Sequence, residues 1–183
     1  MKQLLLICAL LIAFTSCVDT PKPQTAIQQP DEENPPMLVA FGTVGDGTSM
    51  HSLELINQKG DTLYFVYENN AVGGLAVGDS VNVEYKNIDG EYNALYIVNF
   101  STLSHRWVSS DEAGAVSFTF GSDGSFSSEG FDKHYLSWHV IGGDIFFELE
   151  DRTDKYAIDL LTDDVLSLLS LTDGTTLSFS RDE

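Results

Sequence analysis

The chain of 183 residues carries 28 Asp and Glu against 9 Lys and Arg, which gives a formal net charge of −19. Because neutralisation of phosphates by Lys and Arg dominates nucleic-acid affinity, this charge argues against nucleic acid as a partner. Cys8 and Cys17 are the only cysteines, so the chain after residue 17 can form neither a disulfide nor a thiolate metal site.

Residues 1–16 have the features of a bacterial signal peptide. Lys2 precedes an apolar run from Leu4 to Phe14, which is about half the length of a membrane-spanning helix. The sequence Phe14-Thr15-Ser16-Cys17 resembles the lipobox of bacterial lipoproteins, which implies that the mature protein begins at a lipid-modified Cys17 and has a membrane as its partner through that lipid. The alternative is an ordinary secretory signal with an incidental cysteine.

The residue after Cys17 indicates to which membrane the lipoprotein is sorted. Val18 stands where the lipoprotein family carries an aspartate as its inner-membrane retention signal. The resemblance therefore implies a protein of the cell envelope, lipid-anchored to the outer membrane, in either leaflet.

A tether is expected at residues 17–36. This segment contains all five prolines of the chain and no aromatic residue. Such a composition buries too little surface to repay the entropy of ordering, so we expect a disordered tether. Its reach is up to about 60 Å when extended.

From residue 37 onward, the apolar residues alternate with polar ones, and the period of two predicts β-strands. Val81, Val83 and Tyr85 show the pattern, and turn dipeptides such as Asp89-Gly90 separate such runs. Short helices are expected only at 69–77 and 163–169. The sequence therefore predicts an all-β protein, which we divide into domains at 37–101 and 102–183.

The first domain, 37–101, is expected to contain five strands. They are placed at 38–45, 51–57, 62–67, 80–87 and 93–100. The segment from Leu75 to Glu84 resembles the L-x-x-G-D-x-V-x-V entry into the fourth strand of small bacterial OB-fold domains, which implies a small antiparallel OB-like barrel. The tyrosines of this domain either pack in the barrel or form a sugar- or protein-binding face; they are Tyr64, Tyr67, Tyr85, Tyr92 and Tyr96.

The second domain, 102–183, is expected to form eight strands. They are placed at 105–109, 115–120, 124–128, 134–141, 144–150, 155–160, 164–170 and 175–181. The order of Trp107, Phe118-x-Phe120, Trp138-x-Val140 and Leu177-x-Phe179-x-Arg181 resembles small lipocalin-like domains of bacterial lipoproteins, which implies an eight-stranded up-and-down barrel.

In lipocalins a tryptophan of the first strand packs under an arginine of the last strand and closes one end of the barrel. The resemblance assigns these positions to Trp107 and Arg181 and implies a cation–π contact between them. The glycine that the pattern has two residues before the tryptophan is His105 here.

The interior of this barrel is expected to be either a dry core or a small cavity for an apolar ligand. An eight-stranded barrel leaves an interior that side chains can just fill. The inward positions are apolar and mostly large, as in Phe118, Phe147 and Phe179.

The sequence offers no catalytic motif, so we expect no enzyme. The four histidines, His51, His105, His134 and His139, are scattered and lack a neighbouring nucleophile. No metal site and no cofactor are expected.

Two short segments resemble the Asp-Ser/Thr-apolar sites that some Gram-negative bacteria O-glycosylate after export. They are Asp61-Thr62-Leu63 and Asp79-Ser80-Val81, which makes Thr62 and Ser80 candidate O-glycosylation sites. Both segments also read as ordinary junctions between a turn and a strand.

Two functions are consistent with these features. A pair of barrels on a lipid anchor also resembles the envelope-stress lipoproteins of the outer membrane. Here the two barrels stand in the reverse order, and the cysteines of that family are missing. The first function is a non-enzymatic binding module for a small apolar ligand, a glycan or an envelope protein. The alternative is a structural or stress-signalling component of the envelope without a small-molecule ligand.

Overall fold

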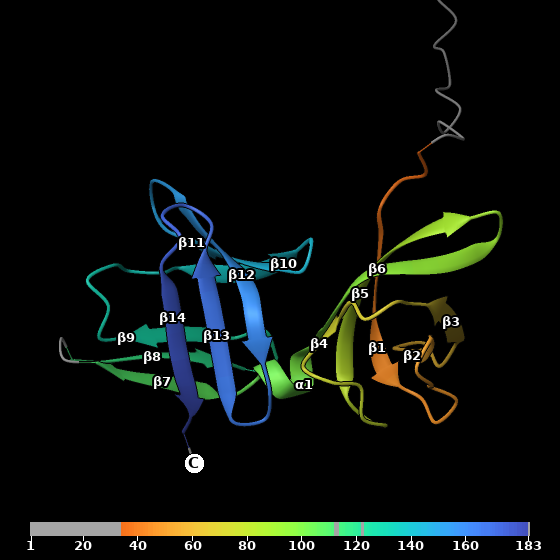
Figure 1. The fold of residues 1–183 in the computed structure, drawn as a ribbon, viewed down its shortest axis with the longest axis horizontal. Coiled ribbons are helices and arrows are strands. Elements are labelled where there is room, and N and C mark those ends of the chain that lie inside the picture. Colours follow the sequence, from red (N-terminus) through yellow and green to blue (C-terminus); the bar gives the residue numbers. More distant parts are fainter. Residues whose placement is uncertain (1–33, 112–113, 122, 183) are drawn as a thin grey trace, which may run out of the picture.

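The computed structural model describes residues 34–111, 114–121 and 123–182, which form two β-barrels connected by a single helical turn (Figure 1). The first barrel comprises β1 (Leu38–Val44), β2 (Ser52–Asn57), β3 (Thr62–Val66), β5 (Ser80–Ile88) and β6 (Glu91–Asn99). The short strand β4 (Ala71–Val72) pairs with the outer edge of β6.

The first barrel closes in the order β3-β2-β1-β5-β6, with β6 returning to β3. All neighbouring pairs in this ring are antiparallel except β3 and β6, which run parallel through the register pairs Phe65–Tyr92 and Val66–Asn93. Because side chains alternate between the two faces of a strand, every second residue points into the barrel. The buried core consists of Val44, Leu53, Leu55, Phe65, Val81, Val83, Ala94 and Ile97.

The second barrel is an antiparallel sheet of eight strands in the order β10-β11-β12-β13-β14-β7-β8-β9, and it is nearly closed. Its strands are β7 (Arg106–Asp111), β8 (Gly114–Phe120), β9 (Phe126–Glu129), β10 (Ser137–Ile141), β11 (Asp144–Glu148), β12 (Thr153–Leu161), β13 (Val165–Ser170) and β14 (Thr176–Arg181).

Aromatic rings fill the interior of the second barrel. Phe118 is fully buried at their centre, and its ring stacks on Phe147 at a centroid distance of 4.6 Å and on Phe131 at 4.5 Å. Tyr135 and Phe179 also contact the Phe118 ring. Packed rings of this kind stabilise a protein interior by their buried area and by specific pair geometry.

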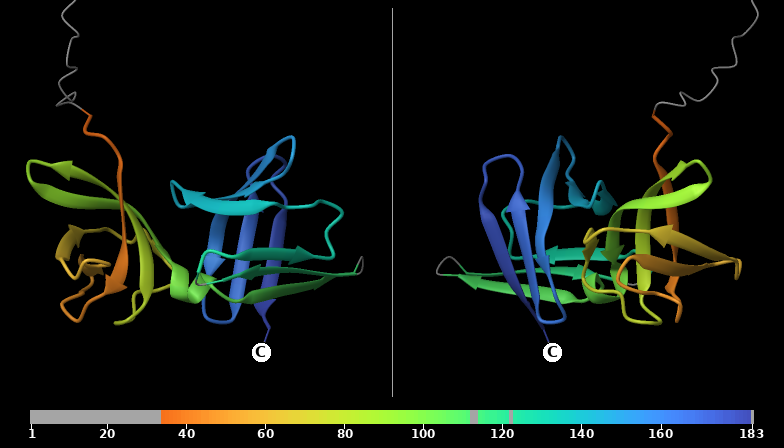
Figure 2. Two further views of the ribbon diagram at one scale, coloured as in Figure 1. Left: turned by 180° about the vertical axis from the view of Figure 1, so that it is seen from behind. Right: turned by 45° about the vertical axis from the view of Figure 1, so that its right-hand side comes forward.

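The helix α1 (Phe100–Leu103) lies between the two barrels, as both views in Figure 2 show. Asn99 caps this helix, because its side-chain oxygen accepts a hydrogen bond from the Thr102 N–H at 2.9 Å. The Asn99 side-chain nitrogen donates to the carbonyls of Gly73 and Gly74 and, at 2.7 Å, to the Asp79 carboxylate. Asn99 itself is completely buried.

Apolar side chains from β6 and α1 belong to the core of the second barrel. Val98 and Leu103 are buried with the aromatic cluster, and Phe100 packs against it with its ring 5.5 Å from that of Trp138. On the other side Phe100 contacts Phe41 of β1 at 5.6 Å. The two barrels therefore share a continuous hydrophobic contact.

Two polar or close contacts supplement this apolar junction. The buried carboxylate of Glu84 on β5 accepts a hydrogen bond from the Gly142 N–H in the turn between β10 and β11 at 2.8 Å. At Gly73, whose φ is 92°, an added Cβ would lie 2.8 Å from the Asn99 Cβ and 2.9 Å from a methyl group of Leu161. Only glycine allows this approach between the 73–79 loop and the second barrel.

The prediction of an all-β protein with two successive barrels is confirmed. The helices expected at 69–77 and 163–169 were wrong. The first segment contains positive φ angles at Asn69, Gly73 and Gly74, which interrupt any helix. The second overlaps the strand that was also expected at 164–170, and the structure forms this strand as β13, in which Leu166 and Leu168 pair with Phe179 and Leu177 of β14.

Replacement of Asn99 by alanine is expected to lower the free energy of unfolding by about 2 kcal/mol, because the variant loses the cap of α1, leaves the buried Thr102 N–H without an acceptor and removes the hydrogen bonds to the 73–79 loop. Urea denaturation of the protein and its Asn99→Ala variant measures the difference. Asn87→Ala is the control, since it removes one exposed hydrogen bond to the Gly90 N–H. Equal effects of the two substitutions would contradict this role of Asn99.

Candidate functional site

The outward face of β2 and β3 carries the most exposed tyrosine among those placed in strands. Tyr64 has 60 % of its surface exposed and stands opposite Glu54 in the β2–β3 ladder. The neighbouring cross-strand pairs are Ile56 with Thr62 and Ser52 with Val66. This face therefore presents an aromatic ring between small polar, acidic and aliphatic side chains.

A groove of about 580 Å³ lies beside this face. It is lined by β3, by Ser52 of β2 and by Gly90, Glu91 and Tyr92 from the turn and first residues of the β5–β6 hairpin. The turn forms because Asp89 and Gly90 both adopt positive φ, at 54° and 90°. Tyr64 thus belongs to a depression and not to a flat surface.

The five tyrosines named from the sequence separate into two groups. Tyr85 and Tyr92 pack on the buried ring of Phe65, with centroid distances of 4.9 Å and 5.7 Å. The Tyr67 hydroxyl donates to the Ser49 carbonyl at 2.8 Å. Tyr64 and Tyr96 stay exposed, and of these two Tyr64 lines the groove, together with the packed Tyr92.

The charge of the groove is negative. Glu91 lines it, and no Lys or Arg is among its lining residues in the described part of the chain. Glu54 lies on the adjoining face, where its carboxylate accepts a hydrogen bond from the Gly47 N–H at 2.7 Å. A polyanion would meet no neutralising cation here, so the groove suits an uncharged or cationic ligand.

The candidate O-glycosylation residues differ in accessibility. Thr62 begins β3, is exposed and lines the groove. Ser80 begins β5 and is half-buried, with its N–H bonded to the Ser101 hydroxyl at 2.8 Å. Modification at both positions stays a prediction, as does the lipid on Cys17, which lies outside the described residues.

Trp107 and Arg181 lie directly opposite each other where β7 pairs with β14. Trp107 is fully buried and its Nε1–H donates to the Leu103 carbonyl at 2.9 Å, whereas Arg181 is exposed. The structure shows no cation–π contact between them. His105, which replaces the glycine of the lipocalin pattern, instead packs its ring edge-on to the indole at 6.3 Å.

The four histidines do not converge on a site. His105 is beside Trp107, and His139 stacks on Phe146 and lies 3.6 Å from Glu148 on the outer face of the second barrel. Within residues 34–111, 114–121 and 123–182, no group of three His, Cys, Asp or Glu side chains is arranged to hold a metal ion.

A second depression, of about 330 Å³, lies at one end of the second barrel around Asp154. The Asp154 carboxylate accepts hydrogen bonds from Lys133 at 2.6 Å, from the Tyr135 hydroxyl at 3.2 Å and from Arg152 at 3.3 Å. Desolvation acts to raise the pKa of Asp154, but these cations and hydrogen bonds outweigh it and lower the pKa. The positive charges are already neutralised within the protein, so the depression offers no free anion site.

Asp173 closes the turn between β13 and β14 near this depression. Hydrogen bonds from Ser170 and Thr175 lower the pKa of Asp173 to about 2. Because the pKa is lower in the folded state, the ionised carboxylate stabilises the fold above the ordinary pKa of about 4, and this contribution is lost as the pH falls towards 2.

We therefore expect Asp173→Ala to destabilise the protein at neutral pH and to have a much smaller effect at pH 2, where about half of the wild-type carboxyl is protonated. Urea unfolding at the two pH values measures the difference. Asp151→Ala removes an exposed carboxylate that makes no hydrogen bond to a described residue, and it should change stability little at either pH. A destabilisation by Asp173→Ala that is independent of pH would exclude the proposed titration.

Comparison with protein-family models, curated proteins and solved structures finds no match to the chain. In the described residues, no helix has the length and apolar character required to cross a bilayer.

Proposed function

We propose that this protein is a non-catalytic binding module, anchored by lipid on Cys17 to the outer membrane, and that the Tyr64 groove binds a glycan. The observation that carries the proposal is the exposure of Tyr64 in a groove bordered by hydroxyl and carboxylate groups. Binding sites commonly combine an apolar platform with a few placed polar groups.

The chemistry of the groove favours a sugar over the other ligand classes. A tyrosine ring offers an apolar face to the C–H surface of a sugar. Ser52, Thr62 and Glu91 offer hydrogen-bonding groups along the groove. OB-fold barrels, which the first domain resembles, bind oligosaccharides and oligonucleotides on the face of their second and third strands. The negative charge of the groove disfavours an oligonucleotide.

A small apolar ligand in the second barrel has less support. Its interior is occupied by the rings packed around Phe118, including Phe147 at 4.6 Å and Phe131 at 4.5 Å. A ligand of any size would have to displace these rings from a close-packed core.

An array of neutral, amino and acidic oligosaccharides probed with the protein tests the groove. Tyr64→Ala is expected to lower the affinity for the bound sugars by about tenfold, which corresponds to about 1.4 kcal/mol of binding free energy. Tyr64→Phe keeps the ring and should retain most of the affinity. Undiminished binding by Tyr64→Ala, or the absence of binding to every sugar on the array, would overturn the glycan assignment.

The anchor has a separate test. Cys17→Ser removes the acceptor thiol and is expected to move the protein from the membrane fraction to the soluble fraction, because the acyl chains supply the membrane affinity. Fractionation and intact mass of the wild type, which should show the added lipid, measure this. A wild-type protein with an unmodified Cys17 would refute the anchor while leaving the groove untouched.

A further inference from the structure

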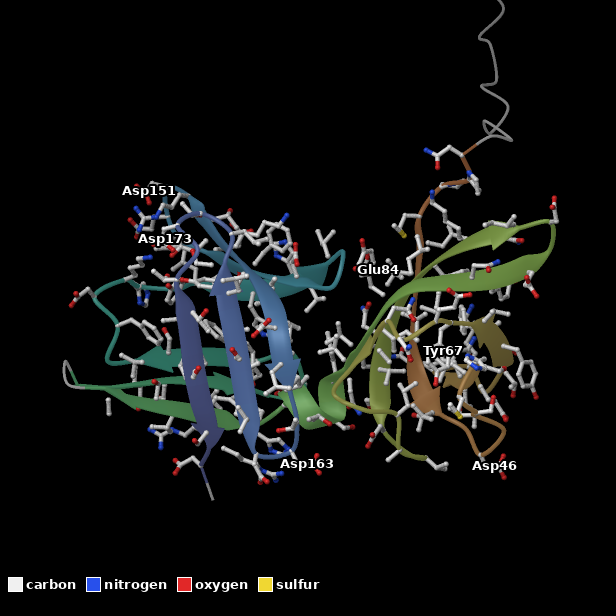
Figure 3. All side chains as sticks on the ribbon, in the orientation of Figure 1. Asp46, Tyr67, Glu84, Asp151, Asp163 and Asp173 are labelled. Atoms are coloured by element: carbon white, nitrogen blue, oxygen red, sulfur yellow. The ribbon has the colours of Figure 1, made fainter. Side chains whose placement is uncertain are left out.

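The Tyr64 groove follows the edge of a strand. Residues from both faces of β3 line one side of it, and the turn and first residues of the β5–β6 hairpin line the other. The parallel register between β3 and β6 contains two pairs, Phe65–Tyr92 and Val66–Asn93. Figure 3 marks the residue after β3, Tyr67, on the side of the first barrel that faces away from the second. The groove is therefore a fork in which β3 and β6 diverge.

The β2–β3 ladder shows which backbone groups of β3 face this fork. The Asn57 N–H donates to the Asp61 carbonyl at 2.9 Å just before β3 begins. Hydrogen-bonded pairs alternate with non-bonded pairs along an antiparallel ladder. Every second residue of β3, beginning with Leu63, therefore bonds to β2. The residues between them, which include Thr62 and Tyr64, direct their N–H and C=O groups to the opposite side.

β6 uses part of this edge. In a parallel ladder a residue bonds to the two residues that flank its register partner. Tyr92 is the partner of Phe65, so it engages the Tyr64 C=O and the Val66 N–H. The Tyr64 N–H and both backbone groups of Thr62 lie beyond this pairing, on the open side of the fork.

The opposite wall does not satisfy these three groups. The Gly90 N–H donates to the Asn87 side chain at 3.0 Å, inside its own hairpin, and so does not bond to the Thr62 C=O. The Tyr64 N–H and the Thr62 N–H and C=O have no hydrogen-bond partner among the described residues. The groove thus offers a peptide donor and a peptide acceptor beside the exposed Tyr64 ring.

The substituents that a sugar can carry fit these groups unequally. A free N–H needs an acceptor, and a protonated amine has none. A carboxylate could accept the bond, but it would meet the negative charge of Glu91 in the groove. The carbonyl of an amide is the usual partner of a backbone N–H, is uncharged, and projects further from the sugar ring than a hydroxyl does.

We infer that the groove selects glycans whose sugars carry N-acetyl groups, an inference that rests on the proposed glycan function. The sugar ring covers the Tyr64 side chain, and the acetamido carbonyl reaches the strand edge and accepts the Tyr64 N–H. A neighbouring sugar hydroxyl donates to the Thr62 C=O. The acetyl methyl group contacts the half-buried side chains of Leu63 and Tyr92, which line the groove.

An added peptide strand fits the fork less well. Strand addition gains its affinity from main-chain hydrogen bonds along an edge, and strands are commonly five or six residues long. Here the free groups end at Tyr64, because β6 already occupies the edge at Val66.

Calorimetric titration of the full chain with matched tetrasaccharides tests the inference. The probes are the β-1,4-linked tetramers of N-acetylglucosamine, glucosamine and glucose, which differ only in the substituent on C2. A peptide of four alanines supplies amides without a sugar. Measurements at about 0.15 M salt screen attraction of the glucosamine tetramer to the overall charge. The N-acetylated tetramer should bind at least about tenfold more tightly than each of the other probes.

The Tyr64 amide proton gives a readout that no side chain supplies. In the free protein it should exchange rapidly with solvent, and the N-acetylated tetramer should slow its exchange and shift its NMR signal. The Leu63 amide is the control, since it bonds to β2 and should change little. Thr62→Val and Ser52→Ala remove hydroxyl groups from the groove and should keep the preference for the N-acetylated tetramer.

The outcomes separate this inference from the proposed function. Equal binding of the N-acetylated and glucose tetramers, an unchanged Tyr64 amide, or loss of the preference in Thr62→Val or Ser52→Ala would overturn the N-acetyl selectivity and leave a glycan groove. Tighter binding of the alanine peptide, or binding of no sugar at all, would overturn the glycan function and the selectivity with it.

Discussion

The side chain of Asn99 is the polar contact on which the arrangement of the two barrels depends. Its oxygen caps α1, and its nitrogen lies within 3.1 Å of three acceptors, in the 73–79 loop and on Asp79. The amide nitrogen has two protons, so the three acceptors share them. An aspartate at this position could not donate to any of them, and an apolar residue would leave the buried Thr102 N–H without its acceptor.

The apolar contact around Asn99 makes the two barrels one unit. Val98 and Leu103 are buried in the core of the second barrel, although Val98 lies on the last strand of the first. The connection between the barrels is the single turn α1, which leaves no length of chain for independent motion. The two barrels are therefore joined by packed side chains as well as by the chain itself.

Much of this architecture could be predicted from local pattern, because alternation directly reports which face of a strand is buried. Val81 and Val83 are such a case, because both are fully buried and the Asn82 between them is half-buried. The exposure of Tyr64 could not be predicted in this way, since Leu63, Tyr64 and Phe65 form a continuous apolar run. The helix α1 escaped prediction since one turn has no periodicity, and only Asn99 as a cap residue marked it. The shared core at the junction could not be predicted, because Val98 and Leu103 enter the core of the second barrel only through the packing of one barrel on the other.

The position of β14 has a consequence for the order of folding. In the second sheet β14 lies between β13 and β7, so it joins the group β10 to β13 to the group β7 to β9. Until residues 176–181 are present, these groups are two separate sheets with unpaired edges, and the apolar surface of β6 and α1 has no complete core to enter. In a chain that forms its strands from the N-terminus onward, both groups therefore keep unpaired edges until the last strand is added.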